Sequence, residues 1–293
     1  MNEKLRIWLE AARPRTLPAS IAPVVVGAAV GFAEAGWRPL VLAAVLAAAL
    51  AIQIATNFVN DWGDFQRGAD TPDRVGPRRA VAAGLIPART MFSAAMVLFA
   101  VAAVIGLGLI GVGGWPILWI GVASILSGLA YTAGPMPLAY VGLGDLFVFA
   151  FFGPVAVLGT EWLMIDRTTE AGWLASLALG ALATAILVVN NIRDAEGDAR
   201  AGKRTLVVRF GRPIGRGFYV LLLLVALLVP LLLVVLDLAG PPVLLAWLAA
   251  PLARAPLQAV FLPNAGAALN EALGATARLH LAFGALLAVG FLL

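Results

Sequence analysis

The sequence has no cysteine, a single histidine and few charged residues. Of its 293 residues, 12% are charged, against about 25% in an average soluble domain. The absence of cysteine excludes disulfides, thiolate catalysis and cysteine-ligated metal sites. The hydrophobic content of 62% and the mean hydropathy of +0.97 are typical of a polytopic helical membrane protein. We therefore expect an all-α bundle that forms one integral domain over residues 1–293 in the lipid bilayer.

Long apolar stretches divide the chain into nine candidate spans. A helix needs roughly 20 apolar residues to cross the hydrocarbon core. The eighth stretch is short and contains Pro251 and Pro256, so eight or ten spans remain alternatives. The nine spans are placed near residues 16–33, 39–59, 90–112, 115–132, 144–165, 171–191, 214–237, 241–256 and 275–293.

The basic residues are unevenly distributed between the loops. With nine spans, only Arg38 and Arg167 of the 20 Lys and Arg residues fall on one side of the membrane. Loops rich in Lys and Arg usually stay in the cytoplasm. We therefore predict a multi-pass protein of the cell inner (plasma) membrane, with the N-terminus in the cytoplasm and the C-terminus outside. Because the basic residues report topology, they give no reason to expect nucleic acid as a partner.

Two acidic clusters each follow a long apolar run, and the predicted topology puts both at the cytoplasmic surface. Carboxylates so close to the membrane interior are costly and usually functional. The spacing i, i+3, i+7 places three members of each cluster on one helix face. These members are Asn57, Asn60 and Asp64 in the first cluster, and Asn191, Asp194 and Asp198 in the second.

Hard oxygen ligands without histidine or cysteine favour Mg²⁺ over zinc. Two facing clusters can hold two Mg²⁺ ions around one diphosphate. An isolated aspartate at a helix end is more often a cap, but the pairing of two clusters favours a metal site. The expected metal ligands are Asp61, Asp64, Asp70, Asp194 and Asp198.

Basic and amide side chains beside these aspartates are candidate substrate contacts. Arginine suits bidentate binding of phosphate, although each basic residue taken alone is equally well explained as a topology signal. The candidate substrate-binding residues are Asn57, Asn60, Arg67, Arg74, Arg78, Arg79, Asn190, Asn191, Lys203 and Arg204.

Three segments resemble the UbiA superfamily of intramembrane aromatic prenyltransferases, namely residues 57–86, 131–160 and 190–211. The wider superfamily commonly has a third acid four residues after the second in the first motif. Here Gly68 stands four residues after Asp64, and the acid follows at Asp70. This variant is similar to the menaquinone branch, which prenylates 1,4-dihydroxy-2-naphthoate, and unlike the 4-hydroxybenzoate branch.

The resemblance implies nine transmembrane helices around a central cavity that opens laterally to lipid. It also implies Mg²⁺ dependence, with the polar loops after the second and sixth spans closing over the diphosphate. The implied reaction transfers a polyprenyl group from polyprenyl diphosphate to 1,4-dihydroxy-2-naphthoate. Diphosphate and CO₂ leave, and the product is demethylmenaquinol.

Two further residues are candidates for the chemistry of this reaction. An allylic cation needs a dry, aromatic-lined cavity, and Tyr131, at the start of the second matching segment, is the first candidate to face it. Asp145 follows Gly142-Leu143-Gly144, and it either orients the hydroxyls of the acceptor or caps a helix.

Two other functions remain as alternatives. The first alternative is an enzyme that transfers the prenyl group to another aromatic acceptor, such as homogentisate. A membrane cation transporter is a different class, and it predicts acids and broken helices near the bilayer midplane. The acids here lie at span ends beside basic loops, which favours phosphate binding.

Overall fold

The computed structural model describes residues 2–36, 38–70, 76–262 and 266–293. These residues form helices and connecting turns, without a β-strand among them. Helices are expected here, because a backbone inside the bilayer must satisfy its own hydrogen bonds. The predicted all-α class is confirmed.

Twelve α-helices and three tighter or wider helical segments follow one another in the described residues. Segments η1 and η3 are 3-10 helices, and η2 is a π-helical turn. The order is α1 (Glu3–Ala11), η1 (Pro14–Thr16), α2 (Pro18–Ala35), α3 (Pro39–Gln66), α4 (Ala88–Gly113), α5 (Trp115–Ala130), α6 (Leu138–Val141), α7 (Gly144–Ala150), η2 (Phe151–Val155), α8 (Ala156–Ile165), α9 (Glu170–Arg200), α10 (Leu206–Val235), η3 (Pro241–Ala253), α11 (Arg254–Phe261) and α12 (Gly266–Leu292).

Seven helical stretches in the described residues are long and apolar enough to cross a membrane. The α1–η1 segment and α2 form a pair bent by 52°, which makes up to eight spans. Helix α5 is also apolar but shorter, with 16 residues. Each of the nine predicted ranges therefore coincides with an apolar helical segment, and nine is an approximate count of spans.

Two helices continue well beyond their predicted ends. Helix α3 ends at Gln66 and α9 at Arg200, several residues beyond the expected positions 59 and 191. Hydropathy reports where the apolar run stops, whereas a helix continues until the backbone turns. Both acidic motifs consequently lie on rigid helix, on the last turns of α3 and α9.

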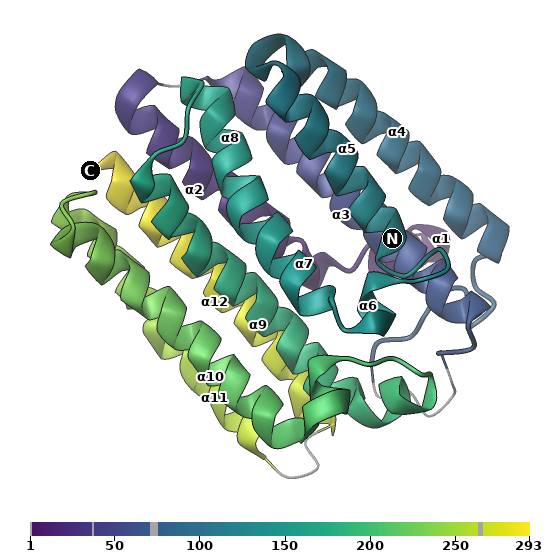
Figure 1. Ribbon diagram of the computed structural model, residues 1–293. Coiled ribbons are helices and arrows are strands. Elements are labelled where there is room, and N and C mark those ends of the chain that lie inside the picture. The colour runs from purple at the N-terminus through teal and green to yellow at the C-terminus, as the bar shows by residue number, and fades with distance from the viewer. Residues whose placement is uncertain (1, 37, 71–75, 263–265) are drawn as a thin grey trace.

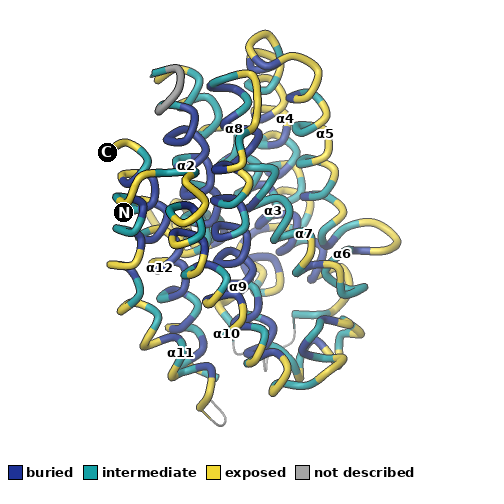
Figure 2. The backbone as a smooth tube through the Cα atoms, turned by 60° about the vertical axis from the view of Figure 1, so that its left-hand side comes forward, coloured by how far each residue is buried: buried dark blue, intermediate teal, exposed yellow. Residues whose placement is uncertain are grey.

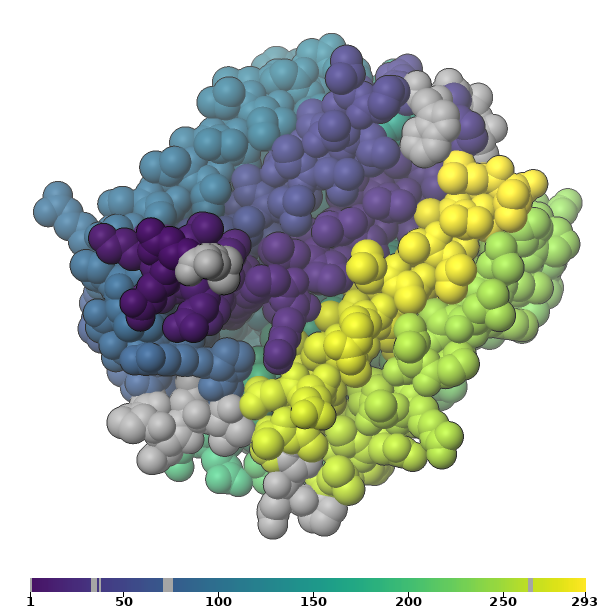
Figure 3. Space-filling view, turned by 180° about the vertical axis from the view of Figure 1, so that it is seen from behind, coloured from purple at the N-terminus to yellow at the C-terminus, as the bar shows by residue number. Residues whose placement is uncertain are grey.

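Helix α9 runs through the middle of the bundle, and Figure 1 shows the other helices arranged around it. Most of its residues are buried, while α4 and α5 expose many side chains on the outside (Figure 2). Seen from behind, α12 crosses the molecule between α2 and the segment formed by η3 and α11 (Figure 3). The helices α3, α4 and α5 form a separate group, and this grouping leaves space between them and α9.

Small residues permit the closest contacts at the centre of the bundle. A Cβ on Gly153 would lie 2.6 Å from the carbonyl oxygen of Ser176, and a Cβ on Gly284 would lie 2.8 Å from the Cβ of Ala22. Helix interfaces in membranes commonly use small residues in this way, because van der Waals packing replaces the hydrophobic effect there. Close packing of α9 against its neighbours fixes the direction in which its acidic end points.

Candidate active site

A cavity of about 520 Å³ lies inside the bundle, between α9 and the group formed by α3, α4 and α5. Apolar side chains from α2, α3, α4, α5, α8 and α9 form most of its wall. Its polar wall includes residues from both acidic motifs, namely Asn57, Asn60, Asp64, Asn190, Asn191, Asp194 and Asp198, together with Arg13, Arg79, Tyr131, Asp145 and Lys203.

Both motif helices end in the same type of turn. The amide of Gly68 donates to the carbonyl of Phe65, and the amide of Ala69 donates to that of Asp64. In α9, Gly202 donates to Ala199, and Lys203 donates to Asp198 at 2.8 Å. This pair of bonds defines the Schellman motif, in which a left-handed glycine ends the helix. After each turn, the chain runs back toward the last aspartate of the helix, which is Asp64 in α3 and Asp198 in α9.

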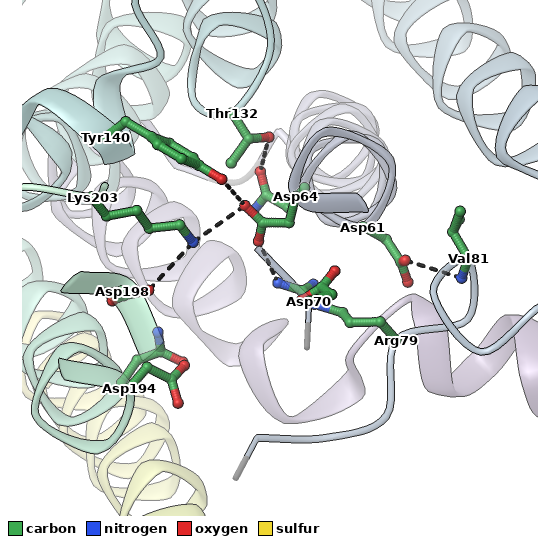
Figure 4. A network of polar contacts seen from close by, with 12 residues as sticks. Asp61, Asp64, Asp70, Arg79, Val81, Thr132, Tyr140, Asp194, Asp198 and Lys203 are labelled. Atoms are coloured by element: carbon green, nitrogen blue, oxygen red, sulfur yellow. Dashed lines mark hydrogen bonds and ion pairs between the residues drawn. The ribbon is translucent and has the colours of Figure 1, made fainter. Parts of the chain in front are cut away.

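Asp64 lies at the centre of the polar network shown in Figure 4. Its side chain is buried, and its Oδ2 accepts a hydrogen bond from Arg79 Nη2 at 2.9 Å. The hydroxyl of Tyr140 donates to Oδ1 at 3.0 Å. Burial, followed by the charge of Asp64, raises the pKa of Tyr140, so its hydroxyl remains a donor.

Lys203 connects the two acidic motifs. Its Nζ lies 3.2 Å from Asp64 Oδ1 on α3 and 3.5 Å from Asp198 Oδ1 on α9 (Figure 4). The two motifs therefore meet at one point, although more than 130 residues separate them in the sequence. Their prediction as parts of one site agrees with this geometry.

Asp70 reaches the network from the turn after α3. Its Oδ1 lies 3.4 Å from Nε of Arg79, which pairs with Asp64 through Nη2. The left-handed Gly68, with φ of +66°, makes this return possible. Arg79 thus lies between Asp64 and Asp70. The glycine at position 68, in place of an acid, allows the turn that brings Asp70 to Arg79.

Asp61 points away from the other aspartates. Its two oxygens accept hydrogen bonds from the backbone amides of Ala80 and Val81, at 3.0 and 3.1 Å. It is not part of the cavity wall. The position of Asp61 favours a role in holding the segment that carries Arg79, and the structure does not bring it to the expected metal position.

Asp194 pairs with its neighbour Arg193. The guanidinium contacts both carboxylate oxygens, at 2.8 and 2.6 Å, and it also donates to Asn190 and Asn270. Arg193 is buried. This arginine fixes the carboxylate of Asp194, which lines the cavity.

The amide side chains connect the site to its surroundings. Asn57 donates to the carbonyl of Ala12, which ties α3 to the N-terminal segment. Asn60 accepts from Thr132 at 2.8 Å. Asn191 donates to Asp145 at 3.3 Å, and both residues belong to the cavity wall. Tyr131 lines the same wall, as expected, and its hydroxyl lies close to Gly144.

The remaining basic candidates lie farther out. Arg67 is exposed, donates to the carbonyl of Gly134, and has its guanidinium carbon 5.2 Å from the ring centre of Tyr140. Arg78 and Arg204 are exposed, and the backbone amide of Arg204 donates to the carbonyl of Tyr140. Arg74 lies outside the described residues. Of the predicted basic contacts, the structure brings Arg79 and Lys203 to the carboxylates.

Tyr140 and Arg193 contact the carboxylates of the site, and sequence reasoning missed both. Tyr140 lies on the four-residue helix α6, which is too short to show a periodicity, and its place in the matching segment 131–160 was the only available signal. Arg193 was recognisable as a base immediately before Asp194 in an apolar setting, where an unpaired charge is costly.

The donor set fits a magnesium–diphosphate complex. In the described residues, no three acidic or histidine side chains are close enough to enclose an ion by themselves. Mg²⁺ is usually bound by one or two carboxylates, with water and substrate phosphate completing its shell. Asp64, Asp194 and Asp198 face one cavity and carry the oxygen ligands that such an ion requires.

Several named relatives align with most of the chain. A 1,4-dihydroxy-2-naphthoate octaprenyltransferase from Mycobacterium tuberculosis is 44% identical over 84% of this chain and 83% of its own length. The Bacillus subtilis protein of the same name is 32% identical over 98% of this chain and 92% of its own. The Haemophilus influenzae protein is 38% identical over 78% and 77%.

Solved structures share the fold at lower identity. A UbiA homolog from Aeropyrum pernix has a TM-score of 0.70 and 17% identity, over 93% of this chain and 97% of that one. A UbiA homolog from Archaeoglobus fulgidus bound to GPP and Mg²⁺ has a TM-score of 0.61 and 16% identity, over 96% and 99%. Residues 20–291 match the UbiA prenyltransferase family, and the chain therefore belongs to that family.

Proposed function

We propose that this protein transfers a polyprenyl group from polyprenyl diphosphate to 1,4-dihydroxy-2-naphthoate. Diphosphate and CO₂ leave, and demethylmenaquinol is formed. The observation that carries the proposal is the meeting of both acidic motifs at Lys203, beside an apolar cavity inside the bundle. The relatives named as octaprenyltransferases support the choice of donor and acceptor.

Mg²⁺ is the proposed cofactor, with two ions for each diphosphate. Asp64, Asp194 and Asp198 are the residues that would hold it, because they share one cavity wall. When bound, the metal supplies Lewis-acid stabilisation of the leaving oxygen. The Archaeoglobus homolog bound to GPP and Mg²⁺ supports this assignment.

The chain's own residues bind the donor and control its surroundings. Arg79 and Lys203 neutralise the charge that develops on diphosphate as the allylic C–O bond breaks and its electron pair leaves with the phosphate. The apolar wall of the cavity excludes water from the allylic cation that remains. Phe147 and Phe151, stacked with ring centres 5.9 Å apart, and Tyr131 present aromatic rings there.

The acceptor is proposed to bind near Asp145. Its ring carbon that carries the carboxylate attacks the cation, and a C–C bond forms. The bond to the carboxylate then breaks, CO₂ leaves, and the released electron pair restores the aromatic ring. This sequence conserves charge without a protein base, so the Asp145–Asn191 pair serves to orient the hydroxyls of the acceptor.

The site is proposed to face the cytoplasm from the inner membrane, with the C-terminus outside. The acidic ends of α3 and α9 lie toward the same end of the bundle as α1, and the C-terminus lies toward the other end (Figure 1). The excess of Lys and Arg in the loops at the acidic end supports the assignment of that end to the cytoplasm.

A transfer assay tests the function. Membranes containing the protein receive labelled farnesyl or geranylgeranyl diphosphate, Mg²⁺ and 1,4-dihydroxy-2-naphthoate, and the product is identified by mass. We expect a prenylated product that has lost CO₂. Parallel reactions with homogentisate test the acceptor. Folded protein that gives no such product, or that prefers homogentisate, would contradict the proposal.

A further inference from the structure

Lys203 occupies a position between carboxylates that suits a bound cation. Its Nζ is 3.2 Å from Asp64 Oδ1 and 3.5 Å from Asp198 Oδ1, so these oxygens are no more than 6.7 Å apart, the sum of the two distances. The same Nζ lies 5.0 Å from the ring centre of Tyr140. Only 13% of the lysine side chain is exposed. This ammonium group is therefore held by two acids and one aromatic ring, each from a different segment.

We infer that Lys203 is a built-in counter-ion, which holds the two motifs together and keeps free divalent metal out until diphosphate arrives. The metal then enters as its complex with diphosphate, and Lys203 transfers its charge from the aspartates to the phosphate. The inference rests on the proposed function, because it concerns the order in which that site is filled.

Electrostatics explains why free metal is excluded. A divalent ion beside Asp64 and Asp198 would share their oxygens with an ammonium group of like charge, which opposes its binding. Diphosphate adds several negative charges and gives the lysine a new partner. The metal–diphosphate complex can therefore bind, whereas the charge of Lys203 opposes binding of the metal alone.

The structure allows this exchange with a small movement. The backbone amide of Lys203 is fixed to the carbonyl of Asp198 at 2.8 Å by the turn at Gly202. Only its flexible four-carbon stem has to rotate for the ammonium group to leave the carboxylates. Arg79 has no such freedom, because Asp64 and Asp70 hold its guanidinium from two sides.

Binding of Mn²⁺ alone, measured by electron paramagnetic resonance on the purified full chain, tests the inference. Without diphosphate, we expect Lys203→Met to bind Mn²⁺ at least about tenfold more tightly than the wild type, since a neighbouring charge changes such equilibria by ten- to a thousandfold. Lys203→Arg keeps the charge and should remain weak. Arg200→Met removes an equal charge from an exposed position at the end of α9 and should resemble the wild type.

Inorganic pyrophosphate provides the second arm. Pyrophosphate should strengthen Mn²⁺ binding by the wild type, and the Mn²⁺ affinities of the wild type and Lys203→Met should become more similar. Lys203→Gln, which keeps a polar side chain, replaces the methionine variant if that variant melts early. Equal Mn²⁺ affinities of the wild type and Lys203→Met without pyrophosphate, when the wild type transfers prenyl groups, would overturn the inference and leave the function standing. If Lys203→Met binds Mn²⁺ more tightly than the wild type, but the folded wild type transfers no prenyl group, the proposed function would be overturned. The role of Lys203 as a counter-ion would then still be supported.

Discussion

Gly68 and Gly202 occupy equivalent positions in the two acidic motifs. Each lies four residues after the last aspartate on its helix, and each has a positive φ, +66° and +74° respectively. The first turn returns Asp70 to Arg79, and the second returns Lys203 to Asp198. Both acidic motifs thus end in the same type of glycine turn, which the spacing of the aspartates alone does not predict.

Gly202→Ala should destabilise the protein by about 1 kcal/mol, because alanine resists the left-handed conformation. Thermal unfolding in detergent measures the change. Gly197→Ala is the matched control on the same helix. Its Cβ would meet nothing within 4 Å, and alanine favours helix, so its stability should rise by a few tenths to about 1 kcal/mol. The same sign in both variants would contradict the role of the turn.

Asp64→Asn and Asp194→Asn should each lower turnover by at least about a hundredfold, because each removes a carboxylate that would hold the metal needed to stabilise the leaving diphosphate. The prenyl-transfer assay measures the loss, and membrane extraction verifies insertion. Asp166→Asn serves as the control. Asp166 is exposed in the turn after α8 with a φ of 58°, which asparagine also tolerates, so activity should be unchanged. Wild-type rates in the Asp64 or Asp194 variant would refute the site.

Asp61→Ala should act mainly through stability. It leaves the buried amides of Ala80 and Val81 without their acceptor, at a cost of about 1–3 kcal/mol for each. We expect a lower melting temperature and faster proteolysis of the segment before α4. Asp61→Asn keeps one acceptor oxygen and should be intermediate. A variant that melts like the wild type yet loses all activity would instead restore Asp61 as a metal ligand.

Tyr140→Phe should reduce turnover about tenfold, since it removes a hydrogen bond to a charged acceptor. The pH dependence gives a further check. Burial and the charge of Asp64 raise the pKa of Tyr140 above its usual value of about 10. The phenol therefore keeps its proton between pH 7 and 9.5, and the ratio of wild-type to variant rates should be constant over that range. A ratio that falls toward one as the pH rises would show that Tyr140 ionises earlier.

The comparison of sequence and structure shows where pattern reasoning ends. Hydropathy located every apolar helical segment, since membrane thickness sets its length. It placed the end of α3 near residue 59 and that of α9 near residue 191, because it reports apolarity and not helix termination. The predicted site residues Asp64 and Asp198 lie on these extended ends, on the same helices as the other members of their clusters.

Asp61 illustrates the complementary failure. It is adjacent in sequence to Asn60 and three residues from Asp64, so spacing groups it with both. In the fold its carboxylate turns to the amides of Ala80 and Val81, nineteen and twenty residues later. No one-dimensional pattern reports that a distant loop will present two amides to one carboxylate.

The sequence by itself determined the class of protein, its apolar segments and the residue types of the site, because each follows from local composition and periodicity. The tertiary structure alone decided which charges meet. It brings Arg79, Tyr140 and Lys203 to the carboxylate of Asp64, and Lys203 also to Asp198. Those pairings depend on how α3 and α9 are held by their packed neighbours, and electrostatic interactions act over a few ångströms in space, whatever the separation along the chain.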